Sequence, residues 1–122
     1  MKTLIISGGS SGIGAATADL FSQKGYKVYD LSRSGQERNG ISHITCDVTI
    51  AESCRAAVEQ VIKEQGRIDV VICNAGWTIS GPIEFATRED VDRLMNVNFY
   101  GALHLAQAVL PHMRAQRHGH IL

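Results

Sequence analysis

The chain has 122 residues, of which 44% are hydrophobic and 20% are charged, values typical of a single globular domain. Twelve Lys and Arg residues balance twelve Asp and Glu residues, so no basic excess is available to bind nucleic acid or an anionic membrane. Three cysteines without a Cys-x-x-Cys spacing argue against a disulfide scaffold or a zinc site, and favour reduced thiols in a cytoplasmic protein. The apolar runs are too short for a signal peptide or a membrane span.

Short apolar runs of strand length alternate along the chain with amphipathic segments of helical periodicity. The predicted strands cover residues 3–7, 27–32, 42–46 and 69–73. The predicted helices cover residues 13–24, 51–65, 87–98 and 99–117. Ile121 and Leu122 resemble the first residues of a fifth strand. Strands that alternate with helices at this spacing predict one α/β domain with a parallel sheet and right-handed crossovers.

Helical periodicity also predicts which side of each helix faces the sheet. The expected apolar faces comprise Ile13, Ala16, Leu20 and Phe21 in the first helix, Cys54, Val58, Val61 and Ile62 in the second, and Leu103, Ala106, Leu110 and Met113 in the last. These three faces are the expected helical contribution to the core.

A glycine-rich turn, Ser-Gly-Gly-Ser-Ser-Gly-Ile-Gly over residues 7–14, joins the first strand to the first helix. Amides at the start of a helix can hold a pyrophosphate, and glycines let the phosphate approach the backbone closely. The spacing Gly-x-x-x-Gly-x-Gly departs from the usual Gly-x-Gly-x-x-Gly, and it is not a P-loop because no Gly-Lys-Ser/Thr follows. Taken alone, the turn leaves two interpretations: a phosphate site, or glycines that serve only a tight turn.

Three further motifs follow the turn in order. Asp47-Val48 follows the third predicted strand, Cys-Asn-Ala-Gly over residues 73–76 follows the fourth, and Asn-Phe-Tyr-Gly over residues 98–101 interrupts the helical region. With these motifs the sequence resembles the classical short-chain dehydrogenase/reductase family. That family carries Thr where this chain has Ser7, and Asn where it has Cys73. The resemblance covers essentially the whole chain, which supplies about half of a family domain of roughly 250 residues.

The resemblance implies a Rossmann-like, doubly wound parallel sheet that is truncated, with four strands present and a fifth only begun. Residues 1–122 would form a single partial domain, the nucleotide-binding half without the catalytic half. Family-like topology implies the strand order 3-2-1-4, with the fourth strand at an open edge. The implied activity is that of an NAD(P)(H)-dependent oxidoreductase that transfers a hydride between the cofactor and an alcohol or carbonyl substrate.

The resemblance also assigns roles to residues of the four motifs. Asp47 would accept a hydrogen bond from the adenine amino group, although it could instead only cap the segment that follows. Asn98 would break its helix locally and hold a water that relays protons to the family's catalytic Lys, although it could be a harmless exposed residue. The expected cofactor-binding residues are Gly8, Ser10, Ser11, Gly12, Ile13, Gly14, Ser32, Arg33, Asp47, Val48, Asn74, Ala75 and Gly76.

The choice between NAD and NADP depends on the end of the second strand, where an acidic residue binds the ribose 2′-hydroxyl and a nearby Arg accommodates a 2′-phosphate. Ser32 occupies that position, Arg33 follows it, and Asp30 lies too deep in the strand to reach the ribose. We therefore expect NADP(H), with NAD(H) less favoured. The alternative is that Arg33 is only a solvated loop charge.

The family's chemistry needs a Ser on the fifth strand and a Tyr-x-x-x-Lys on the helix that follows, and this chain has neither. We therefore expect the 122-residue chain alone to be inactive, as a piece of an oxidoreductase. The alternative is a non-catalytic nucleotide-binding or interaction module. The family forms subunit contacts through the long helix over residues 99–117, so we also expect a homo-oligomer. No metal site is expected.

Overall fold

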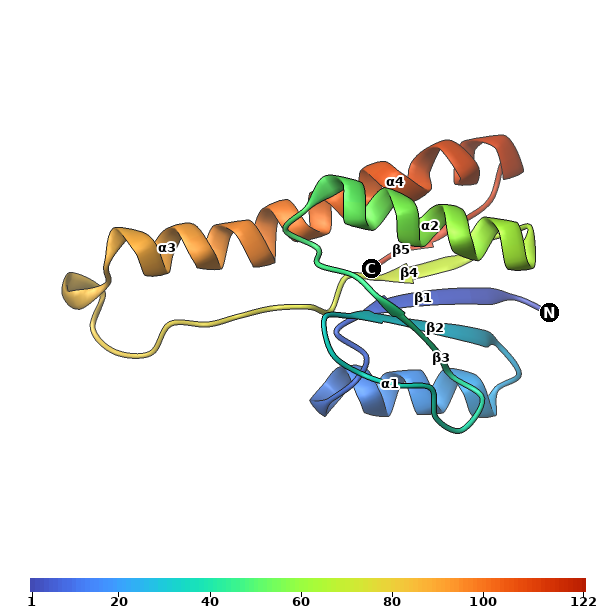
Figure 1. The fold of residues 1–122 in the computed structure, drawn as a ribbon, viewed down its shortest axis with the longest axis horizontal. Helices are drawn as coiled ribbons and strands as arrows, with labels where there is room; N and C mark the ends of the chain where they lie inside the picture. Colours follow the sequence, from blue (N-terminus) through green and yellow to red (C-terminus); the bar gives the residue numbers. More distant parts are fainter.

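The computed structural model describes residues 1–122 as a parallel sheet covered by helices on both faces (Figure 1). The strands are β1 (Thr3–Ser7), β2 (Lys27–Ser32), β3 (Ser42–Thr45), β4 (Val70–Ile72) and β5 (His120–Ile121). The helices are α1 (Gly12–Gln23), α2 (Ala51–Gln65), the 3₁₀ turn η1 (Ile83–Phe85), α3 (Arg88–Met95), the π-helical turn η2 (Asn96–Tyr100) and α4 (Gly101–Gln116). The fold is therefore the predicted α/β class, with most boundaries within one residue of those expected.

The strand order is β3-β2-β1-β4-β5, and every neighbouring pair is parallel. The central strand β1 is buried along its whole length, as a continuous apolar run in a parallel sheet requires. The position of β1 between β2 and β4 is the point at which the chain reverses its direction of winding. In sheets of this kind, ligands bind beside the carboxyl ends of the strands at that point.

The expected open edge at β4 is wrong. The amide of Leu122 donates to the carbonyl of Val71 at 2.9 Å, and the amide of Cys73 donates to the carbonyl of Leu122 at 2.7 Å. Two residue pairs in parallel register join β5 to the short strand β4, so β5 covers the edge that was expected to be open. The unpaired backbone groups on this side of the sheet belong to β5.

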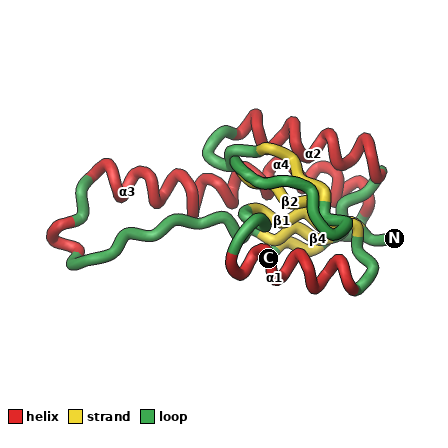
Figure 2. The backbone as a smooth tube through the Cα atoms, turned by 60° about the horizontal axis from the view of Figure 1, so that its bottom comes forward, coloured by secondary structure: helices red, strands yellow, loops and turns green.

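Helix α1 covers one face of the sheet, and α2 and α4 lie side by side over the other (Figures 1 and 2). The larger apolar cluster lies under α2 and α4, and the smaller one lies under α1. The expected face of α2 is confirmed, because Cys54, Val58 and Val61 are buried. No helix combines the length and the apolar character that crossing a membrane would require.

The expected faces of the other two helices are largely wrong. Helix α1 buries Gly14 and Ala18, whereas Ile13 is 82% exposed. At Gly14 the helix runs almost in contact with the glycine turn, which leaves no room for a side chain, and Ala18 packs among apolar residues of the sheet. Helix α4 buries Gly101, Leu105, Val109 and Met113. Of its expected face only Met113 is buried, and the residues that pack into the core are Leu105, Val109 and Met113.

Candidate dinucleotide site

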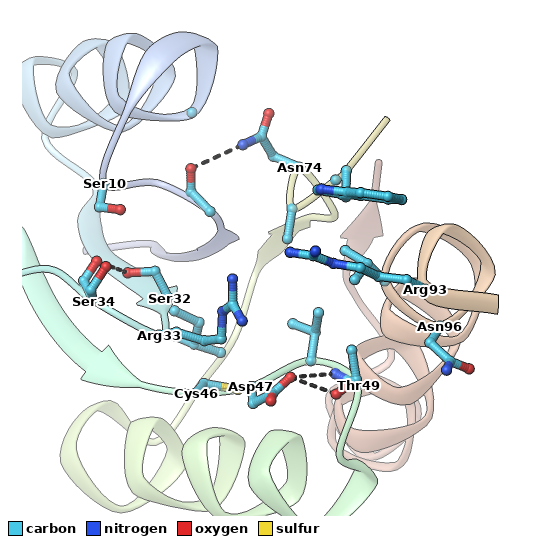
Figure 3. Close-up of a pocket in the computed structure, with 18 of the residues that line it drawn as sticks. Ser10, Ser32, Arg33, Ser34, Cys46, Asp47, Thr49, Asn74, Arg93 and Asn96 are labelled. Carbon is cyan, nitrogen blue, oxygen red and sulfur yellow. Dashed lines mark hydrogen bonds between the residues drawn. The ribbon is translucent and has the colours of Figure 1, made fainter. Parts of the chain in front are cut away.

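A cavity of about 1030 Å³ opens at the carboxyl ends of the strands, a volume at the upper end of the size range of ligand sites. The glycine turn, the end of β2, the segment after β3 and the segment after β4 form one side of it. Helix α3 and the start of η2 form the other side. The structure brings every predicted cofactor residue except Gly12 to its lining (Figure 3). Asn98, the predicted catalytic residue, lies outside this lining.

The glycine turn is folded tightly against the segment that follows β4. Gly8 and Gly12 have φ angles of 67° and 58°, values that favour glycine. A Cβ on Gly14 would lie 2.3 Å from the carbonyl oxygen of Gly8 and 2.4 Å from Nδ2 of Asn74. At this position only glycine leaves room for the turn and the helix to approach each other.

Residues of the Cys-Asn-Ala-Gly motif hold the turn in place. Asn74 Nδ2 donates to the carbonyl of Gly8 at 3.1 Å, as Figure 3 shows. Ser7 Oγ accepts hydrogen bonds from the amides of Asn74 at 3.0 Å and Ala75 at 2.9 Å. The hydroxyl of Ser7 therefore connects the glycine turn to the segment after β4. Ser in place of the family's Thr keeps this hydroxyl.

The first amides of α1 have no side-chain partner. Ser11 occupies the N-cap position in extended conformation, but its side chain makes no capping hydrogen bond, and the first turn of the helix has no acidic residue. By contrast, Thr87 at the start of α3 accepts a hydrogen bond from the amide of Asp90 at 3.1 Å. Helix N-termini favour anions, and unpaired amides are strong donors. The start of α1 can therefore receive an anionic group such as a pyrophosphate.

The end of β2 places a hydroxyl and a guanidinium beside the cavity. Arg33 is exposed and points into the cavity in Figure 3, and Ser32 lies next to it. The carboxylate of Asp30 is buried behind Ser32, as the sequence analysis expected from its depth in the strand. Gly9 donates its amide to Asp30 Oδ1 at 2.7 Å, so the buried carboxylate also supports the glycine turn.

One carboxylate oxygen of Asp47 makes local hydrogen bonds, and the other is free to bind a ligand. Its Oδ1 accepts hydrogen bonds from the amide of Thr49 at 3.0 Å and from the hydroxyl of Thr49 at 2.7 Å. The hydroxyl contact is the largest influence that lowers the pKa of Asp47, with a further contribution from the charge of Arg33. Oδ2 accepts no hydrogen bond within the chain, so the turn and a ligand can use different oxygens of this carboxylate.

Asn98 lies in the π-helical turn and connects it to the chain after β4. Its Nδ2 donates to the carbonyl of Trp77, and its Oδ1 accepts from the amide of Trp77, both at 2.8 Å. The helix is therefore locally irregular at Asn98, as the resemblance implied. Pairing with a backbone amide and carbonyl explains why an Asn stands here, because no apolar side chain offers both a donor and an acceptor.

Several residues that line the cavity, Arg93 among them, were missed by sequence reasoning. The Arg93 guanidinium lies over the Trp77 ring, 4.4 Å from its centroid, and contributes a second positive group to the lining. Nothing in the local sequence pairs these two residues, which are 16 positions apart on a loop and a helix. The remaining residues of the lining that were not predicted are Leu31, Ser34, Cys46, Thr49, Arg88, Glu89, Asp92, Asn96 and Val97.

The cysteines are free thiols, and Cys46 and Cys54 are buried. A hydrogen bond with Cys54 is the main cause that lowers the pKa of Cys46 to about 7. The same pairing, together with burial, raises the pKa of Cys54. Burial also raises the pKa of Cys73. These thiols lie in the core under α2 and α4, with Cys46 at the floor of the cavity.

Comparison with known proteins identifies the family. Residues 2–122 match the family model of the short chain dehydrogenases. A 3-ketodihydrosphingosine reductase from Bacteroides thetaiotaomicron is 48% identical over 122 residues, which cover 99% of this chain and 45% of that protein. The chain thus spans about half the length of the curated relatives that it matches.

Solved structures agree with this assignment. The ligand-free aldohexose dehydrogenase of Thermoplasma acidophilum superposes with a TM-score of 0.92 at 35% identity, covering 98% of this chain and 47% of that one. ElxO with NADP bound also reaches 0.92, at 28% identity, over 98% of this chain and 53% of that one. A 3-ketoacyl-(acyl-carrier-protein) reductase from Brucella melitensis, complexed with NADH, reaches 0.90 at 27% identity, over 94% of this chain and 51% of that one. The chain belongs to the short chain dehydrogenase family, whose members are oxidoreductases that use NAD(P).

Proposed function

We propose that this chain is the NADP(H)-binding half of an oxidoreductase that transfers a hydride between NADP(H) and an alcohol or carbonyl substrate. The observation that carries the proposal is the start of α1. Its first amides have no side-chain partner, and the cavity beside them is lined by Ser10, Ser11 and Gly14. The donors available there match the charge and the hydrogen-bonding needs of a pyrophosphate.

The other residues of the cavity fit the rest of a dinucleotide. Asp47 and Val48 would hold the adenine, with Asp47 Oδ2 free to accept from its amino group. Asn74, Ala75 and Gly76 would close around the nicotinamide ribose at the opposite end of the lining. The bound nicotinamide would supply the hydride chemistry, whereas these residues bind and orient it.

Arg33 supports a preference for NADP(H). It is the positive side chain that immediately follows the end of β2, where a 2′-phosphate is recognised in folds of this type. The solved relatives include one with NADP and one with NADH, so family membership alone leaves both cofactors open. A guanidinium that contacts a phosphate contributes about 1.5 to 3 kcal/mol.

Calorimetric titration of the chain with NADP⁺ and NAD⁺ tests this proposal. We expect tighter binding of NADP⁺ and a loss of that preference in Arg33→Ala. Arg114→Ala is the matched control, because Arg114 lies in the last turn of α4, outside the cavity lining. A tighter complex with NAD⁺, or an unchanged preference in Arg33→Ala, would contradict the assignment to NADP(H).

The remaining proposals concern the 122-residue chain in isolation. It contains no Tyr followed by Lys at the fourth position, so we expect no hydride transfer from NADPH to any carbonyl compound. NADPH turnover above a protein-free control, in material free of host reductases, would refute this.

We also propose a cytoplasmic location and self-association through α4, whose Leu103 and Leu110 are 38% and 40% exposed. Light scattering at micromolar concentration tests the latter, and a monodisperse monomer would exclude it.

A further inference from the structure

A buried carboxylate lies directly behind the residue that we assign to the ribose 2′ position. Asp30 is 3% exposed, and its Oδ2 accepts a hydrogen bond from Ser32 Oγ at 2.9 Å. The other oxygen, Oδ1, accepts from the amide of Gly9. A single charged group therefore contacts both the glycine turn and the end of β2.

One side chain that can carry a positive charge contacts this carboxylate. His43 lies opposite Asp30 in the register of β2 and β3, and its Nδ1 is 3.1 Å from Asp30 Oδ2. The imidazole is 10% exposed and also approaches Ser32 Oγ at 3.4 Å. No Lys or Arg lies within salt-bridge distance of Asp30. The negative charge behind Ser32 is therefore balanced, at most, by His43.

The hydrogen bonds of Ser32 decide what its hydroxyl can offer to a ligand. The oxygen acceptors within reach of its proton are Asp30 Oδ2 and the carbonyl oxygen of Ser34, the latter at 3.1 Å, and His43 Nδ1 is the other group of the chain that approaches it. With its proton committed inside the chain, the hydroxyl presents lone pairs to the cavity. Lone pairs suit a ribose 2′-hydroxyl, which donates, and they do not suit a 2′-phosphate, which needs donors.

The charge of the Asp30 carboxylate disfavours a 2′-phosphate at Ser32, as the hydrogen bonding of Ser32 does. A phosphate in contact with Ser32 would be separated from the Asp30 carboxylate by little more than that hydroxyl. Like charges at such a separation in a partly buried site oppose each other. Arg33, on the cavity side of Ser32, attracts a 2′-phosphate instead.

We propose that Asp30 is a specificity-determining residue whose buried carboxylate opposes the 2′-phosphate that Arg33 attracts. The preference between NADP(H) and NAD(H) is then a balance between these two charges across Ser32. This inference rests on the proposed function, because it requires the adenosine ribose to bind at the end of β2. Asp30 acts through Ser32 and the local field, while Arg33 acts on the ligand directly.

The test is the affinity of the chain for NADP⁺ and NAD⁺, which differ only in the 2′-phosphate, measured by calorimetry. Asp30→Asn keeps an acceptor for the Gly9 amide, removes the charge, and offers Ser32 Oγ a donor that releases its proton toward the cavity. We expect about fivefold tighter binding of NADP⁺, with NAD⁺ unchanged within about twofold. Loss of a merely structural support would instead weaken both complexes.

A second variant approaches the same charge from the neighbouring strand. His43→Arg keeps the carboxylate and places a permanent cation beside it, so it should also tighten NADP⁺ selectively. If Asp30→Asn does not fold, His43→Arg decides the question alone. Glu59→Gln, which removes one negative charge from an exposed position on α2, is the control and should change neither affinity.

The outcomes separate this inference from the proposed function. Binding of both dinucleotides, with a ratio of affinities that neither variant changes, would overturn the role of Asp30 and leave the proposed function intact. Equal weakening of both complexes in either variant would reduce Asp30 to a structural support. No binding of NADP⁺ or NAD⁺ by the unsubstituted chain would remove the proposed function and this inference with it.

Discussion

The two walls of the cavity are built differently. All of the buried residues lie in the strands of the sheet, in α1, α2 and α4, or in the loops that connect these elements, and the stretch from residue 72 to residue 100 contains none. In Figure 1 this stretch leaves the end of β4, runs past the sheet as a long loop and returns as α3. One wall of the cavity therefore belongs to a packed core, whereas the other projects from it.

The projecting wall depends on a few polar contacts instead of on burial. Asn98 ties η2 to Trp77, Thr87 caps α3, and Arg88 pairs with Asp92 across one helical turn. Hydrogen bonds between partly exposed groups contribute about 1 kcal/mol each, less than a buried aliphatic side chain. The wall of the cavity that the sheet forms therefore has the more stable frame.

The largest expected difference is in the cost of truncating an isoleucine in each wall. Ile5 in β1 is 0% exposed, and Ile83 in η1 is 91% exposed. Ile5→Ala should lower the free energy of unfolding by about 3 to 4 kcal/mol, because it removes buried methyl groups and leaves a void. Ile83→Ala, the matched control, should change it by less than about 0.5 kcal/mol. Urea denaturation measures both, and similar losses would show that the projecting wall is packed after all.

The next effect concerns the contact between the glycine turn and α1. Gly14→Ala introduces a methyl group where the Gly8 carbonyl and Asn74 leave no space. We expect a loss of about 2 to 3 kcal/mol in stability and of measurable dinucleotide binding. Gly12→Ala is the comparison, because a Cβ there would meet nothing within 4 Å and only the φ angle of 58° is unfavourable. Its cost should be about 1 kcal/mol, and equal costs would contradict the steric explanation.

Removal of the Asn98 side chain should open the projecting wall locally. Asn98→Ala deletes both hydrogen bonds to the Trp77 backbone, at a cost of about 1.5 kcal/mol. Amide hydrogen exchange should quicken at Trp77 and leave β1 unchanged. Asn96→Ala is the control, because the Asn96 side chain makes no hydrogen bond within the chain. Faster exchange throughout the sheet would show that the two walls unfold together.

The smallest effect is expected at the start of α3. Thr87→Ala removes the acceptor for the Asp90 amide and should destabilise the first turn of this helix by about 1 kcal/mol. Ser11→Ala should leave the stability of α1 nearly unchanged, because the Ser11 side chain makes no capping hydrogen bond. Hydrogen exchange of the first amides in each helix compares the two caps. A larger effect for Ser11 would contradict our account of free amides at α1.

Strand and helix positions could be predicted from the sequence because they depend on local periodicity. The runs at residues 3–7 and 27–32 and the helix at 51–65 have the predicted bounds. Helix orientation was harder to predict where contact distance overrides hydrophobicity. Helix α1 turns Gly14 and Ala18 inward and leaves Ile13 in solvent, and at Gly14 the close approach to the glycine turn leaves no room for a side chain.

The edge of the sheet also depended on more than periodicity. Ile121 and Leu122 suggested a strand that had only begun, and their pairing with β4 depends on where α4 ends. Arg117 in left-handed conformation ends α4, and the turn that follows it directs residues 120–122 alongside β4. The distance between two segments that are far apart in the sequence, such as β4 and residues 120–122, cannot be predicted from local periodicity.

The class of fold, the glycine turn and the residues of the four motifs could be predicted from the sequence, because each is a local pattern of size, polarity or spacing. Which groups face one another depends on the tertiary structure. Asp30 and His43 are 13 residues apart and meet because β2 and β3 pair in that register. Trp77 is held by Asn98 and stacked under Arg93 because a loop and a helix meet beyond the sheet. Such pairings depend on the summed packing of the whole chain, which no short segment encodes.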